Sequence, residues 1–300
     1  MSVKFKEAFS HCLKELNIPN IAISLQKCDF EKILKAHDSI HEFMLIPTGL
    51  ITSNKDFHAK SAFLIYHYEA FYQAHRSLLE ALSGYYNAAY TLLRNTLELI
   101  LKGAFWECMA HKKYRDRYTE AKSGNSKKTP IDQLKEIIRQ KSSIEKLERI
   151  SAKIYDILSE DENLKNIMPK LKPNQIVKQL ASWGIFDPIS NSIEYVYNLC
   201  YKKLSADVHV APDKTNIGKR LLAEKDLFEI EVIPEELNRY AEDLHRVMDI
   251  GIVVELNILE DILNEQSKKW LDKKLTAIRE LGLSYAFKKI SQIIRGNEYA

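Results

Sequence analysis

The chain has 300 residues, of which 45% are hydrophobic and 28% are charged, a composition typical of a folded globular protein with a sizeable core. Its 44 basic and 41 acidic residues give a formal charge of only +3, so any nucleic-acid-binding surface must be local. Four widely separated cysteines, without a C-x-x-C pair or a secretory segment ahead of them, argue against a disulfide framework and indicate a reduced, cytoplasmic protein. The most apolar stretch, residues 248–263, carries four acidic side chains, and we therefore expect no membrane span.

The spacing of apolar residues predicts an all-α fold. Only 9 glycines and 8 prolines interrupt the chain, and apolar positions recur mostly at intervals of three and four. Between residues 59 and 111 this pattern is almost unbroken, with Ser83 and Gly84 as the expected turn between two antiparallel helices. The second helix, from about Tyr85, is expected to turn one apolar stripe inward: Ala89, Leu92, Leu93, Thr96, Leu97, Ile100 and Leu101.

The segment 111–130 interrupts this pattern. It holds seven lysine and arginine residues against two acidic ones, which predicts an exposed basic connection. Thr129 and Pro130 then form a cap-plus-proline signal that starts the next helix. Residues 163–174, with two prolines, are a candidate hinge.

The last part of the chain predicts three more helices. Asp187 and Pro188 indicate the start of a helix over about 188–210. A short extended piece within 226–234, a helix over 234–265 and a last amphipathic helix over 270–294 follow. We expect one domain, residues 1–300: a bundle of long antiparallel helices around the 59–111 hairpin and the 188–210 helix, with the N-terminal and last helices packed around them.

Several patterns of catalytic or binding residues are incomplete. His37 and His41 stand one helical turn apart, a spacing that lets two imidazoles share an ion, but two ligands do not make a site and a third would have to come from elsewhere. We therefore expect a polar helix face, with no metal and no cofactor. Ser205, Asp207 and His209 crowd one turn, which disfavours a serine-hydrolase triad, and no phosphate-binding glycine loop occurs.

Arg94 is the most informative charged residue in the hairpin. An arginine within so apolar a helix needs an anion or several acceptors, and Glu98, four residues later, is the obvious partner. Two interpretations stay open. Arg94 and Glu98 are either part of a binding site or an intrahelical pair that braces the bundle.

Two distant motifs carry a family resemblance. The first reads G-x-Y-x-x-A-x-x-x-x-R-x-x-x-E, and the second reads Y-x-x-L-S-x-x-x-H; together they resemble helical proteins grouped in the HEPN superfamily. Their residues are Gly84, Tyr86, Ala89, Arg94 and Glu98, then Tyr201, Leu204, Ser205 and His209. The match covers residues 59–111 and 188–212. It implies an HEPN-like core, binding of RNA or a nucleotide, and a homodimer that acts as a metal-independent endoribonuclease.

The resemblance also implies roles for individual residues. His209 would transfer a proton at the ribose hydroxyl, with Lys203 and Arg94 stabilising the phosphate charge. Active HEPN enzymes carry an arginine where this chain has Lys203, a departure that puts catalysis in doubt. The supporting residues would be Glu98, Ser205 and Tyr201, and the RNA backbone would lie on Lys112, Lys113, Arg115 and Arg117.

The sequence also allows a second arginine–histidine pair and a second function. Arg239 and His245 match the family's arginine-to-histidine spacing, but one such pair is expected by chance, and a solvated helix face is the simpler interpretation of His245. The rival function is a non-enzymatic helical interaction or scaffold protein. In that case Arg94, Glu98, Tyr201 and His209 would form an internal polar network that fixes the register of the helices.

Overall fold

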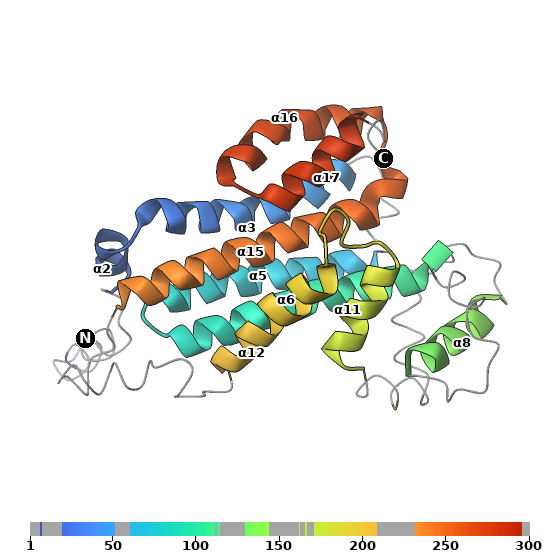
Figure 1. Ribbon diagram of the computed structural model, residues 1–300, viewed down its shortest axis with the longest axis horizontal. Helices are drawn as coiled ribbons and strands as arrows, with labels where there is room; N and C mark the ends of the chain where they lie inside the picture. The colour runs from blue at the N-terminus through green and yellow to red at the C-terminus, as the bar shows by residue number, and fades with distance from the viewer. Residues whose placement is uncertain are drawn as a thin grey trace.

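The computed structural model describes residues 20–51, 61–111, 113–114, 130–143, 171–208 and 232–295, with residues 7, 162 and 166. Every regular element within these ranges is a helix, and none of them is a strand (Figure 1). The prediction of an all-α bundle is confirmed.

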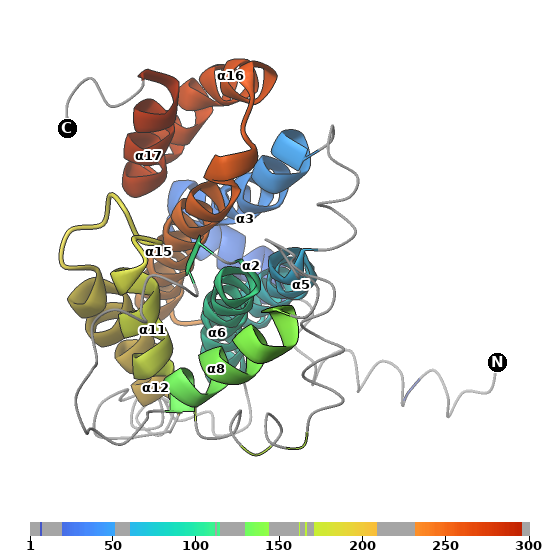
Figure 2. The same ribbon diagram turned by 90° about the vertical axis from the view of Figure 1, so that its right-hand side faces the viewer.

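Four long helices form the centre of the molecule. They are α3 (Phe30–Ile51), α5 (Ala62–Leu82), α6 (Tyr86–Ala110) and α15 (Pro234–Leu259). Helices α5 and α6 pack together most extensively, and α15 lies against α3 and α6, as the end-on view in Figure 2 shows. The largest fully buried side chains come from these four helices and the turns over residues 183–191, among them Phe43, Phe63, Tyr90, Phe105, Phe186 and Tyr240.

The predicted hairpin is present with its predicted turn. The side chain of Ser61 accepts a hydrogen bond from the backbone N–H of Leu64 and so caps the start of α5. Helix α5 ends at Ser83, and Gly84, with φ of 85°, reverses the chain in a conformation that glycine adopts without strain. The expected inward stripe of α6 is buried except for Leu92, which is half-buried: Ala89, Leu93, Thr96, Leu97, Ile100 and Leu101.

Shorter helices surround this centre. They are α2 (Asn20–Lys27), α8 (Pro130–Ser143), α11 (Pro173–Ser182) and the π-helix η2 (Ile193–Tyr201), which continues as α12 (Lys202–Val208). Helix α8 begins at the predicted proline. Helices α11 and α12 pack against α6, so the second motif of the sequence comes to lie beside the first.

The helix predicted over 188–210 begins later than the sequence indicates. Residues 183–191 form turns, the peptide bond between Asp187 and Pro188 is cis, and η2 starts at Ile193. Asn191 has φ of 50°, in the left-handed region, which a continuous right-handed helix cannot include. The cap-plus-proline signal therefore marks a turn rather than a helix start.

The last predicted helix is two helices. Helix α15 ends at Leu259 and passes into the short 3₁₀ helix η3 (Glu260–Ile262), after which α16 (Glu265–Leu281) and α17 (Ser284–Arg295) form a hairpin. Gly282 separates them with φ of 79°, the left-handed conformation typical of a helix C-terminus. Figure 1 shows this hairpin lying across α3 and α15.

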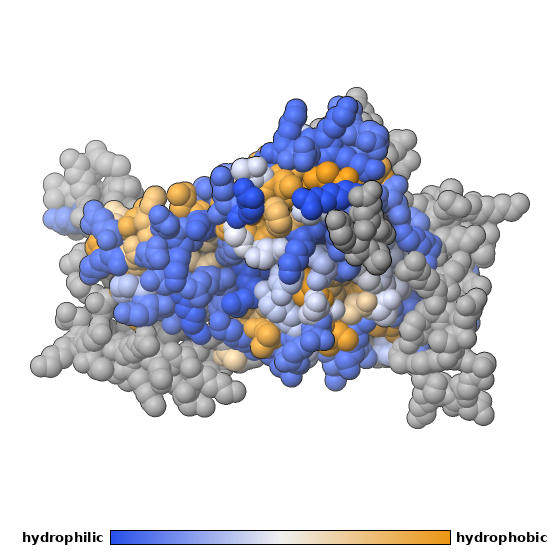
Figure 3. Space-filling model, turned by 45° about the horizontal axis from the view of Figure 1, so that its top comes forward, coloured by the Kyte–Doolittle hydropathy of each residue, from blue (hydrophilic) through white to orange (hydrophobic). Residues whose placement is uncertain are grey.

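Hydrophobic side chains reach the surface in several separate places on the face shown in Figure 3, with hydrophilic ones between them. Within the described ranges, no helix combines the length and hydropathy needed to cross a bilayer. Three sequence-based predictions fall wholly or largely outside the described residues. They are the basic connection over 111–130, of which only residues 111, 113, 114 and 130 are described, the hinge over 163–174 and the extended piece within 226–234.

Candidate functional site

Helix packing brings Arg94, Glu98 and Tyr201 together. Nε of Arg94 donates to Oε1 of Glu98 at 3.1 Å, and Nη2 donates to the hydroxyl oxygen of Tyr201 at 3.0 Å. The Tyr201 hydroxyl in turn donates to Oε1 of Glu98 at 2.8 Å. One residue from the second sequence motif thus closes a ring of hydrogen bonds with two residues from the first.

This network is half-buried and internally satisfied. The side chains of Arg94 and Glu98 are 22% and 19% exposed, and Lys102 adds a hydrogen bond to Oε2 of Glu98 at 3.2 Å. Burial raises the pKa of Glu98, but the hydrogen bond from Tyr201 and the charges of Lys102 and Arg94 outweigh burial and hold that pKa below its usual value. Glu98 is therefore an ionised carboxylate near pH 7, and both of its oxygens accept hydrogen bonds from neighbouring side chains.

Aromatic contacts hold Tyr201 in place. Its ring stacks on that of Tyr197, with centroids 5.6 Å apart and planes 11° from parallel, and the Arg94 guanidinium lies 5.4 Å from the Tyr201 centroid. Burial and the hydrogen bond to Glu98 raise the pKa of the Tyr201 hydroxyl. That hydroxyl therefore remains a protonated donor to Glu98.

We expect Tyr201→Phe to lower the free energy of unfolding by about 1–2 kcal/mol, because the change removes two buried hydrogen bonds to charged groups and leaves the ring packing intact. Chemical denaturation with urea measures this loss. The exposed Tyr72→Phe change is the matched control and should be neutral, since Tyr72 is 70% exposed. Equal stability of Tyr201→Phe and the parent chain would contradict a bracing role.

Lys203 lies in a separate group. Its Nζ is 2.8 Å from Oδ1 of Asp243, and Arg246 also binds Oδ1 of Asp243, at 2.7 Å. Asp243 is only 4% exposed, so one buried carboxylate neutralises two half-exposed cations. Lys203 is thus bonded to α15, whereas Arg94 is bonded to Glu98 and Tyr201.

The remaining candidate site residues lie away from this network or outside the described part of the chain. Ser205 is half-buried on α12, and His209 lies outside the described residues. The chance pair does not meet: Arg239 contacts Glu236 and lies over the Tyr90 ring, whereas Nε2 of His245 donates to the carbonyl oxygen of Leu281 at 2.9 Å. His245 is half-buried rather than on a solvated helix face.

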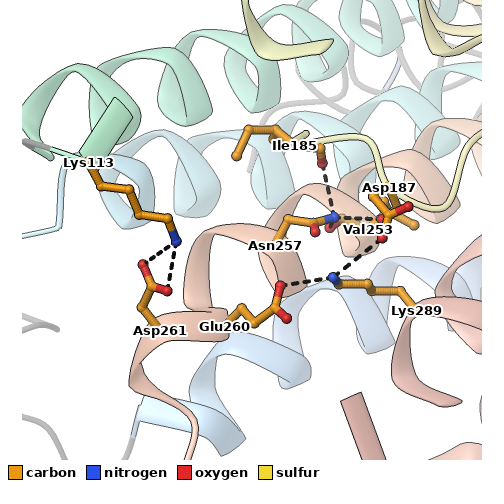
Figure 4. A network of polar contacts seen from close by, with 8 residues as sticks. All are labelled: Lys113, Ile185, Asp187, Val253, Asn257, Glu260, Asp261 and Lys289. Carbon is orange, nitrogen blue, oxygen red and sulfur yellow. Dashed lines mark hydrogen bonds and ion pairs between the residues drawn. The ribbon is translucent and has the colours of Figure 1, made fainter. Parts of the chain in front are cut away.

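Of the four residues predicted to contact the RNA backbone, Lys113 is the one within the described part of the chain. Its Nζ contacts both oxygens of Asp261 at 2.8 and 2.9 Å. Figure 4 shows this pair beside a second group, in which Asn257 holds the carbonyls of the 185–187 turn and Lys289 contacts Glu260. Lys113 thus joins the end of α6 to η3, and Lys112, Arg115 and Arg117 lie outside the described residues.

A second candidate site is a pocket whose wall includes Arg246, the partner of Asp243. It has a volume of about 530 Å³ and is enclosed by η2, α15, the first part of α3 and the α16–α17 hairpin. We call it the basic pocket, because four basic side chains but only two acidic ones line it. The basic ones are Lys32, Lys35, Arg246 and Lys288; Glu242, Asp249, His245, Tyr195 and Tyr285 are also in its wall.

Asp249 organises one wall of the basic pocket. Its two oxygens accept the backbone N–H groups of Tyr285 and Ala286, at 3.1 and 2.8 Å, in the first turn of α17. Burial raises the pKa of Asp249 to about 6, although both hydrogen bonds oppose the shift. Burial also lowers the pKa of His245, and the positive charges of Lys35 and Arg246 lower it further. His245 is therefore neutral near pH 7.

The sequence did not predict the basic pocket, because its walls come from four helical segments that are far apart in the chain. The signal that could have indicated it was Asp249, an acidic residue within the apolar stretch 248–263. Comparisons of this chain with models of protein families, with curated proteins and with solved structures find no match.

Proposed function

We propose that this protein binds a phosphate-bearing ligand of the nucleotide type, RNA or a free nucleotide, in the basic pocket. The observation that supports this proposal best is the excess of cationic side chains around a cavity of about 530 Å³. That volume is within the range of about 300–1,000 Å³ typical of small-molecule sites.

The charges of the pocket favour an anion. Lys32 is paired with Glu242 at 2.6 Å, and Arg246 is paired with Asp243. Neither Lys35 nor Lys288 makes an ion pair with a described residue, although the Lys288 ammonium lies over the Tyr285 ring, 5.6 Å from its centroid. Both ammonium groups can therefore contact phosphate oxygens.

The aromatic residues of the pocket suit the rest of a nucleotide. The rings of Tyr195 and Tyr285 meet edge to face, with centroids 5.2 Å apart and planes 67° from parallel. A tyrosine ring in a cationic pocket offers a surface on which a base can stack, an interaction worth about 1–3 kcal/mol per base. Phosphate contacts and stacking together favour single-stranded RNA or a nucleotide over a simple anion.

Binding of a fluorescein-labelled oligouridylate, measured by fluorescence anisotropy at low and at physiological salt, tests the proposal. We expect saturable binding. The logarithm of the association constant should fall linearly with the logarithm of the salt concentration, because phosphate contacts release counterions. An unlabelled nucleoside triphosphate should compete. Binding that is absent at low salt would overturn the proposal.

The HEPN resemblance also implies RNA cleavage, with His209 as general acid or base and with Lys203 and Arg94 at the phosphate. This catalytic role is separate from binding in the basic pocket, because Lys203 and Arg94 do not line that pocket. If His209 has this role, His209→Ala should slow cleavage by about a hundredfold or more, with the fold intact and with no effect of chelators. Cleavage of a fluorogenic RNA by the parent chain and by this variant is the measurement. Equal rates would remove His209 from the mechanism.

A non-enzymatic interaction protein is the second candidate, and the Arg94–Glu98–Tyr201 network favours it. Those groups satisfy one another, as a structural network does, and Lys203 is neutralised by Asp243. In that case loss of the network would alter stability and leave RNA affinity unchanged.

A reducing, cytoplasmic setting is part of both candidates, since Cys28, Cys108 and Cys200 are free thiols.

A homodimer also belongs to the proposal. Ile65, Tyr72 and Leu79 are 56%, 70% and 41% exposed and recur every seven residues on one face of α5, where the exposed Glu69 and Arg76 lie between them. A second copy can cover this face with both apolar and charged contacts. Light scattering at tens of micromolar is expected to give twice the 34.8 kDa chain mass. Ile65→Glu should return it to a single chain mass, and a monomeric parent chain would remove the dimer.

A further inference from the structure

Three histidines from two helices gather beside the α3–α5 contact. His37 and His41 are one turn apart on α3, with ring centroids separated by 4.5 Å. His75, on α5, lies against both, with centroids 5.2 Å from His41 and 5.9 Å from His37. The packing of α3 on α5 thus supplies the third imidazole that the sequence pattern lacked.

The ring nitrogens are close enough to share an ion. Each ring offers one nitrogen, and the three nitrogens all lie within 4.8 Å of one another. Some point therefore lies within about 2.8 Å of all three, compared with about 2.0–2.1 Å for a zinc–imidazole bond. Small side-chain rotations, with each nitrogen moving inward by roughly 0.7 Å, complete the coordination.

The surroundings resemble those of a ligand set. Nδ1 of His37 is 3.0 Å from Oδ1 of Asp38, the carboxylate–histidine contact that orients a metal-binding imidazole. The Phe71 ring packs on His75, with centroids 4.6 Å apart, and holds it beside α3. Nε2 of His75 is shielded from solvent and has no hydrogen-bond partner among the described residues. A buried, unpartnered nitrogen is costly, and a cation would satisfy it.

The cluster is accessible from solvent on one side. His41 is exposed, and His37 and His75 are half-buried. An ion can therefore enter past His41, and a water molecule can take a fourth position. An all-imidazole set favours a borderline transition ion over Mg²⁺ or Ca²⁺, which prefer oxygen ligands.

We propose that His37, His41 and His75 bind a divalent transition-metal ion of the zinc type, with Asp38 orienting His37. This site is separate from the basic pocket and does not depend on the proposed binding of RNA.

The test uses the full chain without a polyhistidine tag, stripped with chelator and titrated with Zn²⁺ in a calorimeter and with Co²⁺ in a spectrophotometer. We expect one equivalent of ion per chain and the intense visible bands of a tetrahedral Co²⁺ site. His41→Gln and His75→Gln should each weaken binding by more than Asp38→Asn does, and Asp38→Asn should weaken it by about 10–100-fold. Bound Zn²⁺ should also raise the melting temperature of the parent chain.

His111→Gln is the matched control, because His111 lies at the far end of α6 and contacts Asp261 rather than the cluster. It should bind Zn²⁺ as the parent chain does. Melting curves without metal show whether each variant is folded, and His41 is exposed, so His41→Gln does not disturb the core. The proposal is overturned if the parent chain takes up no ion, or if His41→Gln and His75→Gln both titrate like it.

Discussion

Replacing either His67 or Glu255 with alanine is expected to destabilise the fold by about 2–5 kcal/mol, the largest effect of any single change considered for this protein. Nδ1 of His67 on α5 is 2.8 Å from Oε1 of Glu255 on α15, and the two side chains are 1% and 0% exposed. Each alanine opens a cavity in the centre of the bundle and leaves one buried polar group without its neighbour.

The apolar surroundings explain why this pair is so sensitive. The His67 ring packs on Phe43 and Phe63, with centroids 4.4 and 5.8 Å away. Burial lowers the pKa of His67 to about 3 and raises the pKa of Glu255 well above its usual value. The pair is thus a neutral imidazole beside a protonated carboxyl group, at hydrogen-bonding distance but not in line for a hydrogen bond.

The double variant His67→Leu/Glu255→Leu separates the loss of a partner from the loss of volume. Leucines fill the space with apolar groups and leave neither group orphaned, so its stability should be close to that of the parent chain or higher. Urea denaturation of the two alanine variants and the double variant is the measurement. If the double variant were clearly less stable than the parent chain, the pair would be a net stabilising interaction and this explanation would be wrong.

The second large effect is expected for ligand binding. Lys35→Glu combined with Lys288→Glu should weaken binding of a labelled oligoribonucleotide by about a hundredfold or more at low salt, because each lysine that contacts a phosphate contributes a charge-assisted interaction of about 1.5–3 kcal/mol. The slope of affinity against salt should also become shallower by about 1.4–1.8, since two phosphate contacts are lost. Both lysines line the basic pocket and are exposed, so replacing them should not change the packing of the core.

Lys273→Glu combined with Lys178→Glu is the control for net charge. Both lysines are exposed, on α16 and α11, and neither lines the basic pocket. This variant changes the charge of the chain by the same amount and should bind RNA almost as the parent chain does. Equal weakening by the two double variants would mean that RNA responds to the overall charge and not to the basic pocket.

The sequence predicted the features that one helix or one turn decides. The 59–111 hairpin followed from unbroken periodicity and from Gly84, whose conformation suits the turn. Arg94 and Glu98 could be paired because residues four apart share a helix face. The contact of both with Tyr201 was suggested by the family resemblance, not by spacing.

The side-chain clusters that the sequence did not predict all require two or more helices to meet. His75 joins His37 and His41 only because α5 packs on α3, and Glu255 meets His67 only because α15 packs on α5. The breaks at Asn191 and Gly282 were missed because the apolar periodicity continues on both sides of them. Acidic residues inside the apolar helix α15 were the signal that could have indicated such partners.

We propose that the phosphate-bearing ligand binds in the basic pocket, whereas the Arg94–Glu98–Tyr201 network supports the fold. The most direct test measures oligoribonucleotide affinity and melting temperature together for Lys35→Glu/Lys288→Glu and for Tyr201→Phe. The account predicts that the lysine variant loses affinity and keeps its melting temperature, and that Tyr201→Phe keeps its affinity and melts earlier. The opposite pattern, with affinity lost only in Tyr201→Phe, would contradict the account and place the ligand at the network.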